Sequence, residues 1–185
     1  SRVPDDDEVL PYVGMRNVKP NQMSVPTIGR KEYTSGRRFR NQDTLMARIT
    51  PSLENGKTAY VDFLSDGEIA FGSTEFTVMR PKEDVSPCFP YCCARDDRFR
   101  EYAISTMTGS SGRQRVQEKL LGEWGFADYD AEHMARFHEK VKPLFDLITS
   151  NTCENRTLTE TRDYLLPKLI SGEIEVSPEP AESPL

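Results

Sequence analysis

Residues 137–169 carry the pattern that decides the fold, and they read FHEKVKPLFDLITSNTCENRTLTETRDYLLPKL. Ten positions in this stretch are spaced alternately by four and three residues without a break. A strict 3.5-residue repeat predicts a helix that supercoils around a partner helix, because a straight helix drifts away from such a seam. The ten seam residues are Phe137, Val141, Leu144, Ile148, Asn151, Asn155, Leu158, Arg162, Leu165 and Leu169.

Two interpretations fit this seam. In the first, the seam belongs to one helix of a coiled-coil pair. The polar residues Asn151, Asn155 and Arg162 then lower the stability of the pair but fix its register and the choice of partner. In the second, a single amphipathic helix lies on its own globular domain. We expect one helix at 130–142, before Pro143, and a long helix at about 144–166, with Pro167 and Gly172 marking its end.

Length and composition limit the remaining architecture. A chain of 185 residues holds one domain plus an appendage, or two small domains. No apolar run approaches the roughly 18 residues that a membrane span needs, and the acidic opening SRVPDDDE is unlike a signal peptide. This opening, which has no Met, suggests missing N-terminal residues, and the sequence 177–185 suggests a disordered tail. The chain is expected to be cytoplasmic.

Short apolar runs alternate with turn residues between about Tyr12 and Arg80, as in a β-rich domain. We expect strands at 44–49, 58–63, 68–71 and 76–79, with a turn at 65–67. The sequence 54–57, Glu-Asn-Gly-Lys, predicts a hairpin-like turn with positive φ at Asn55 and Gly56. A short helix is expected at 96–107. The predicted fold class is α+β.

Two basic clusters lie in this β-rich part, although the net charge of the chain is −6. Residues 30–48 hold six basic and two acidic residues, and Gly109–Arg115 adds two arginines in a Gly- and Ser-rich segment. Such loops offer backbone N–H groups, hydroxyls and amides to phosphates and base edges. The candidate DNA-contacting residues are Arg37, Arg38, Arg40, Arg48, Thr50, Asn55, Lys57, Ser73, Thr74, Ser110, Ser111, Arg113, Gln114 and Arg115.

A purely structural interpretation of these segments also fits. The polar segments are then hairpin turns or a loop before a strand, and the basic clusters are solvated faces. In that case Arg113 and Arg115 pair with surface acids such as Glu118. Arg37, Arg38 and Arg40 are expected in a loop-like stretch before the strand at Thr44.

No catalytic or metal-binding constellation emerges. His133 and His138 are five residues apart on a helical stretch, which is not the spacing of two ligands on one face, so both are expected on the surface. The sequence has no Walker or Rossmann phosphate loop, no nucleophile elbow and no Asn-Pro-Pro-Tyr-like methyltransferase motif. Cys88, Cys92, Cys93 and Cys153 are expected as reduced thiols, with a zinc site using Cys88, Cys92 and one histidine as the alternative.

Several motifs, taken in order, resemble the specificity subunits of type I restriction–modification systems. The segments 42–57 (QDTLMARITPSLENGK), 67–76 (GEIAFGSTEF) and 109–116 (GSSGRQRV) resemble the target recognition domain of that family. The segments 144–148 (LFDLI), 154–158 (ENRTL) and 162–174 (RDYLLPKLISGEI) resemble its helical spacer. The resemblance covers most of residues 10–176 and is weaker at 82–95 and at 122–130. The second of these segments lacks the Pro-rich stretch that is usual in the family.

The resemblance implies a DNA target recognition domain at 1–130, a spacer and dimerisation helix at 131–176 and a tail at 177–185. Such a chain would read one half of a bipartite DNA site without catalysis. It would pair its helix in an antiparallel coiled coil, either with a second copy in a homodimer or with the other half of a full subunit. The methyltransferase (M) and restriction (R) subunits would be its partners.

The chemistry would depend on S-adenosylmethionine, ATP and Mg²⁺ bound to those partner subunits, and this chain would hold no cofactor or metal. Two other functions are alternatives. One is a protein-interaction scaffold with a dimerisation helix and no DNA contact. The other is a stand-alone nuclease or methyltransferase.

Overall fold

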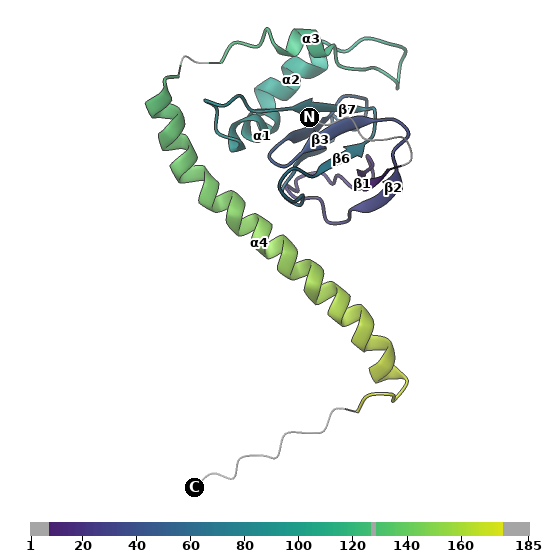
Figure 1. Cartoon of the computed structure of the whole chain (residues 1–185). Coiled ribbons are helices and arrows are strands. Elements are labelled where there is room, and N and C mark those ends of the chain that lie inside the picture. Colours follow the sequence, from purple (N-terminus) through teal and green to yellow (C-terminus); the bar gives the residue numbers. More distant parts are fainter. Residues whose placement is uncertain (1–7, 127–128, 176–185) are drawn as a thin grey trace. The chain divides into compact units, whose positions relative to one another are not determined.

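The computed structural model describes residues 8–126 and 129–175 of the chain. The chain divides into two compact units, residues 1–149 and 150–185. The long helix α4, Ala131–Ile170, begins in the first unit and continues into the second (Figure 1). The expected tail at 177–185 lies outside the described residues. The start of α4 coincides with the functional boundary expected at residue 131, and that functional division stays a prediction.

The first unit contains a four-stranded sheet in the order β2-β1-β6-β3. Its strands are β1 (Val9–Val13), β2 (Gly29–Glu32), β3 (Arg37–Arg40) and β6 (Ile69–Gly72). β1 runs parallel to β6, and the pairs β1–β2 and β3–β6 are antiparallel. β6 lies inside the sheet with all four of its residues buried, which explains its continuous apolar sequence Ile-Ala-Phe.

A second, three-stranded sheet has the order β5-β4-β7. It consists of β4 (Thr44–Ala47), β5 (Thr58–Tyr60) and β7 (Phe76–Met79), and both pairings are antiparallel. These strands and β6 confirm the four strands expected from the sequence, with ends that differ by up to three residues. The two sheets share an apolar core that includes Val13, Phe39, Leu45, Ala70 and Phe76.

Two glycines allow the backbone of the first sheet to close. A Cβ at Gly72 would lie 2.3 Å from the carbonyl oxygen of Val13, and a Cβ at Gly36 would lie 2.2 Å from the carbonyl oxygen of Gly72. Both distances are far below van der Waals contact, so any side chain at these positions would push the strands apart. Glycine at position 72 therefore lets β6 approach β1, and glycine at position 36 lets the start of β3 approach β6.

Three short helices follow the sheets: α1 (Cys88–Arg95), α2 (Asp97–Ser105) and α3 (Glu118–Leu121). Asp96 caps α2, since its carboxylate accepts hydrogen bonds from the backbone N–H groups of Arg98 and Phe99. α2 confirms the helix expected at 96–107. Its buried residues Phe99 and Ala103 are four apart, as on one face of a helix, and belong to a core cluster that includes Met46 of β4.

α4 corrects the prediction of two helices separated at Pro143, because it continues through both Pro143 and Pro167. A proline inside a helix costs about 3 kcal/mol through a lost hydrogen bond and a clash with the preceding turn. Burial beside Pro143 offsets that cost. Phe145 is 6% exposed and its ring meets those of Tyr60 and Tyr91 edge-on, at centroid distances of 5.0 and 5.5 Å.

The first part of α4 therefore belongs to the core of the first unit. Phe137 and Val141 pack with Phe145 against the buried residues Met23 and Cys88. Thr149 donates a hydrogen bond from Oγ1 to Oδ2 of Asp62, at 2.9 Å. The interpretation of an amphipathic helix on its own domain thus holds for the seam positions 137 and 141.

The second unit has no comparable core among its described residues. Every residue from Ser150 to Glu175 is half-buried or exposed. Leu158 is 58% exposed and Leu169 is 40% exposed, and both are seam positions. An isolated helix of this length is marginally stable in water, because most helical stability in proteins comes from packing an apolar face.

The connection between β4 and β5 differs from the expected hairpin-like turn. It spans residues 48–57, and Gly56 alone of the Asn55–Gly56 pair has a positive φ, at 66°. The backbone N–H of Gly56 bonds to the carbonyl of Leu53, and that of Asn55 bonds to the carbonyl of Pro51. These bonds within the loop replace the two-residue turn that the Asn-Gly sequence predicts.

Candidate nucleic-acid interface

Three loop segments converge on one surface of the first unit. The backbone N–H of Arg48 donates to the carbonyl of Glu75 at 2.9 Å, and that of Val116 donates to the carbonyl of Arg48 at 2.9 Å. The N–H of Thr50 reaches the carbonyl of Gln114 at 3.1 Å, and the Oγ1 of Thr50 accepts from the N–H of Gln114 at 3.2 Å. Candidate residues from positions 48–50, 73–75 and 109–115, distant in sequence, therefore lie together.

The segment Gly109–Gln114 is a loop closed at its base. Thr108 and Arg115 exchange two backbone hydrogen bonds, of 3.0 and 2.9 Å. Gly109 and Gly112 have φ values of +127° and +77°, which L side chains rarely adopt, so the glycines shape this turn. The structure thus shows a constrained loop with an isolated antiparallel bridge between Thr108 and Arg115 at its base.

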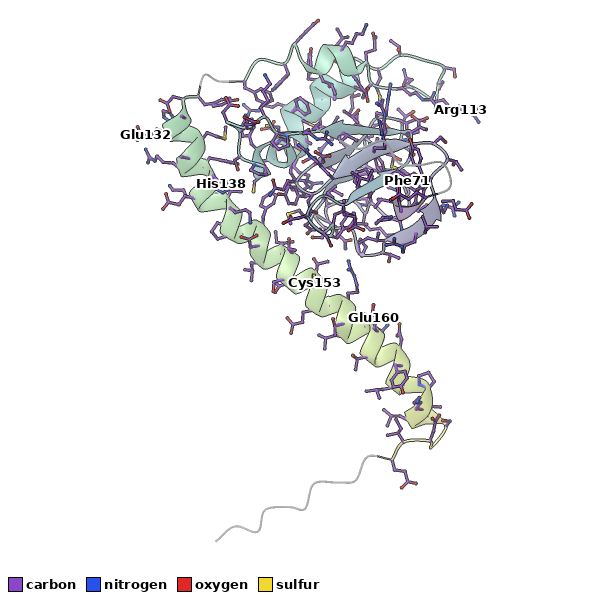
Figure 2. The ribbon with its side chains drawn as sticks, viewed as in Figure 1. Phe71, Arg113, Glu132, His138, Cys153 and Glu160 are labelled. Carbon is purple, nitrogen blue, oxygen red and sulfur yellow. The ribbon has the colours of Figure 1, made fainter. Side chains whose placement is uncertain are left out.

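The tip of this loop presents polar groups to solvent. Ser110, Ser111 and Arg113 are exposed and Gln114 is half-buried. Figure 2 labels Arg113 at the outer edge of the first unit. Within the described residues, no hydrogen bond or ion pair engages the guanidinium group of Arg113. An arginine and a glutamine in such a position have the donors and acceptors for bidentate contact with guanine and adenine.

Other candidate arginines are already paired with glutamates. The guanidinium of Arg115 bonds to the carboxylate of Glu75, with Nη2 at 2.7 Å from Oε1, and this bond lowers the pKa of Glu75. Glu118, in α3, accepts from Nη2 of Arg37 at 2.8 Å and lies 3.3 Å from Nη1 of Arg48. The alternative interpretation, in which Arg113 and Arg115 pair with surface acids such as Glu118, thus holds for Arg115, although its acid is Glu75.

Arg37, Arg38 and Arg40 lie on strand β3, which corrects the expectation of a loop. Gly36 and the density of charge suggested a loop, but Phe39 is 1% exposed and anchors the segment in the core. β3 is an edge strand of its sheet, where charged side chains are common. By strand alternation Arg38 and Arg40 point to the face opposite Phe39.

Asn55 and Lys57 face other parts of the unit. The Nζ of Lys57 donates to the carbonyl of Met15 at 3.0 Å. The carbonyl of Gly56 accepts from Nη1 of Arg95, in α1, at 3.0 Å. This end of the loop 48–57 is thus held by the N-terminal segment and α1. Ser73 accepts a hydrogen bond from the N–H of Glu75 at 3.2 Å, and Thr74 beside it is exposed.

The sequence interpretation missed Arg80. Its Nε and Nη2 atoms bond to Oδ1 and Oδ2 of Asp43 at 2.8 and 2.6 Å. The side chain of Asp43 is 1% exposed, so the pair holds Arg80 in place and keeps its guanidinium charged. Strand pairing explains the contact, since Thr44 is opposite Met79 in the sheet. No local spacing signals a pair of residues so distant in sequence.

The histidines and cysteines form no metal site within the described residues. His133 is exposed and its Nδ1 lies 2.8 Å from Oδ1 of Asp130. His138 is half-buried, which departs from the expected surface position, and its Nδ1 lies 2.9 Å from the hydroxyl of Ser86. All four cysteines are free thiols, and burial raises the pKa of Cys93 to about 12. No helix in the described part of the chain is long and apolar enough to cross a membrane.

Comparison with known proteins gives relatives that all have the same description. The chain is 38% identical over 88 residues to the specificity subunit of the type I restriction enzyme EcoAI from Escherichia coli, a match that covers 47% of this chain and 14% of the relative. It is 29% identical over 94 residues to the HindI specificity subunit of Haemophilus influenzae, covering 51% of this chain and 20% of the relative. About half of the chain is thus similar in sequence to type I restriction enzyme specificity subunits.

Two solved structures share the fold of this chain. The HsdS subunit from Thermoanaerobacter tengcongensis superposes with a TM-score of 0.58 at 17% identity, covering 97% of this chain and 46% of that one. A chain from a type I R-M system, solved to describe complex assembly and conformational transition, gives 0.54 at 20% identity with the same coverages. The present chain thus spans less than half of these specificity-subunit structures. No protein-family profile matches it.

Proposed function

We propose that this chain is a sequence-specific DNA-binding subunit of a type I restriction–modification system. It reads one half of a bipartite DNA site and positions the methyltransferase and restriction subunits, without catalysing a reaction itself. The observation that carries the proposal is the constrained loop Gly109–Gln114, whose exposed Arg113 adjoins polar segments at 48–50 and 73–75. The homology to specificity subunits supports it.

The partner subunits supply the chemistry in this proposal. The methyltransferase subunit would bind S-adenosylmethionine, and the restriction subunit would use ATP and Mg²⁺. The residues assigned to DNA contact, which form the candidate interface, are Arg37, Arg38, Arg40, Arg48, Thr50, Ser73, Thr74, Ser110, Ser111, Arg113, Gln114 and Arg115. Asn55 and Lys57 have the weakest support, because their loop faces the N-terminal segment and α1.

The second half of α4 is the proposed pairing surface. Its seam residues are exposed or half-buried within the chain, and the described part of the second unit buries no apolar residue of its own. A second copy of this chain, or the other half of a longer subunit, would cover that face in an antiparallel coiled coil. Pairing of two copies would imply a DNA site with two identical, inverted half-sites.

One observation favours the alternative of a protein-interaction scaffold. Arg37, Arg48 and Arg115 are neutralised by Glu118 and Glu75, which lowers the positive charge available to DNA. Salt dependence separates the two functions. Binding to duplex DNA should weaken by about 0.9 log units per log unit of salt for each phosphate contacted, whereas a neutral protein interface should depend weakly on salt.

The decisive experiment expresses the chain with its methyltransferase partner in a cell that lacks other DNA methylation. Sequencing of modified bases is expected to give one recurring motif with a fixed gap, and its symmetry reports whether two copies pair. Methylation without a recurring motif would exclude a role of this chain in DNA recognition. Methylation of the same motif in the absence of this chain would also exclude that role.

Replacing Arg113 and Gln114 together with alanine should weaken binding to the cognate duplex by about 1–3 kcal/mol for each base that these side chains read. Folding should be unaffected, because the bonds at the loop base are made by backbone groups and Thr50. Fluorescence anisotropy with cognate and mismatched duplexes measures the change. The matched control replaces Arg98 and Gln22, both exposed and outside this surface. Equal affinities for parent and variant would make the loop a mere connector.

A further inference from the structure

A cleft of 290 Å³ lies where β3 of the first sheet adjoins β7 of the second. Three arginines line it, and none of the described residues that line it is acidic. Arg37 and Arg38 come from β3, and Arg80 directly follows β7. The remaining lining residues are Gly36, Phe39, Ile69 and Val78. A hollow lined by three arginines is an unusual surface for a protein with a net charge of −6.

Two of the arginines, Arg80 and Arg37, are held by acids that are not among the lining residues of the cleft. Asp43 binds Nε and Nη2 of Arg80 and also accepts from the backbone N–H of Arg40 at 2.9 Å. Glu118 binds Arg37 through Nη2, which lies 2.8 Å from both carboxylate oxygens. Nη1 of Arg80, and Nε and Nη1 of Arg37, make no hydrogen bond within the described part of the chain. The guanidinium groups of Arg37 and Arg80 are thus each oriented through one edge and keep N–H donors available on another.

This arrangement suits a tetrahedral oxyanion. Guanidinium groups bind phosphate through parallel N–H···O bonds, and a group whose orientation is already fixed loses little entropy on binding. The side chains of Phe39, Ile69 and Val78 form the apolar part of the lining, which lowers the local dielectric and strengthens the attraction between opposite charges. Because Asp43 and Glu118 balance the charges of Arg80 and Arg37, the cleft fits a group of low charge, such as a phosphodiester.

We infer that this arginine cleft binds a phosphate group, with Arg80 as a binding residue that the loop-based interface does not include. The inference rests on the proposed function in one respect: the phosphate is assigned to the backbone of the bound DNA. A phosphate contact positions the duplex without reading its sequence, so it would complement the base contacts assigned to Arg113 and Gln114.

The test measures the salt dependence of duplex binding for the parent, Arg80→Ala and Arg38→Ala, by fluorescence anisotropy. Removing one phosphate-binding side chain should lower the slope of log affinity against log salt by about 0.9, equally on cognate and unrelated duplexes. Arg38→Ala is included because Arg80→Ala leaves the buried carboxylate of Asp43 unpaired and can impair folding. Arg98→Ala is the matched control, since Arg98 also pairs with a neighbouring acid, Asp96, but lies outside the cleft.

A parallel titration adds inorganic phosphate to the same proteins and follows the guanidinium N–H signals of Arg80 and Arg37 by NMR. Shifts in the parent, together with the reduced DNA slope, would establish the cleft as a site for backbone phosphate. Shifts with an unchanged DNA slope would keep the phosphate site but overturn its assignment to DNA. No shift and no change of slope would overturn the inference even if the parent binds DNA. A parent that binds phosphate but no DNA would refute the proposed function and the assignment of the phosphate to DNA, and would leave the phosphate site standing.

Discussion

Replacing Leu158 and Leu165 together with aspartate should convert the helix-paired protein into single chains. Leu158 is 58% exposed within the chain and Leu165 is half-buried, so neither contributes to a core that the described residues form. In an antiparallel coiled coil both would lie in the seam, where two carboxylates per helix would be buried without partners. Such unpaired buried charge costs about 3–5 kcal/mol, enough to separate a modest helix pair.

Light scattering over a range of protein concentrations measures this effect. The matched control places aspartate at Thr157 and Tyr164, which have the same seven-residue spacing but lie beside the seam and are exposed. The control should keep the mass of the parent. An unchanged mass for the Leu158 and Leu165 variant would show that the seam is no interface. A parent that is itself monomeric would exclude a second copy and leave the other half of a longer subunit as partner.

Replacing Phe145 with alanine should lower the free energy of unfolding of the first unit by about 3–5 kcal/mol. Phe145 is 6% exposed and joins the start of α4 to Tyr60 and Tyr91 through edge-on ring contacts. Removing the ring leaves a cavity and abolishes this packing. Urea unfolding followed by fluorescence of Trp124, the single tryptophan, measures the change.

The neighbouring substitution Leu147→Ala serves as the control, since Leu147 is 58% exposed and alanine is a good helix former. At a concentration where the chain is monomeric, this control should change the free energy of unfolding by less than about 0.5 kcal/mol. Equal and small effects for the two variants would mean that α4 does not stabilise the domain, contrary to the packing described above.

The sequence predicted those elements whose signals are local. The strands at β4, β5, β6 and β7 have buried apolar runs between turn residues, and α2 has a capping aspartate. β1, β2 and β3 were not predicted. β2 and β3 carry more charged than apolar residues, which hides the usual strand signal. α1 was hidden by Pro87, Pro90 and its cysteines, although proline is tolerated in the first turn of a helix.

The candidate interface was predictable only where its residues are adjacent in the sequence. The exposed loop at Gly109–Gln114 follows from its glycines and serines, which are adjacent in the sequence. The pairing of Arg115 with Glu75, and of Arg80 with Asp43, depends on which strands become neighbours. No residue spacing reports such contacts, so the distinction between paired and available arginines required the structure.

The parallel pairing of β1 with β6 also has a consequence for how the chain folds during synthesis. Tyr12 is paired with Phe71, so β1 leaves the ribosome well before its neighbour in the sheet exists. β2 can cover one edge of β1 early, but the other edge stays open until β6 emerges. Closing such a long-range pair is slow, and an open strand edge invites pairing with other chains. The nascent first sheet is therefore the part of this protein most exposed to aggregation before folding is complete.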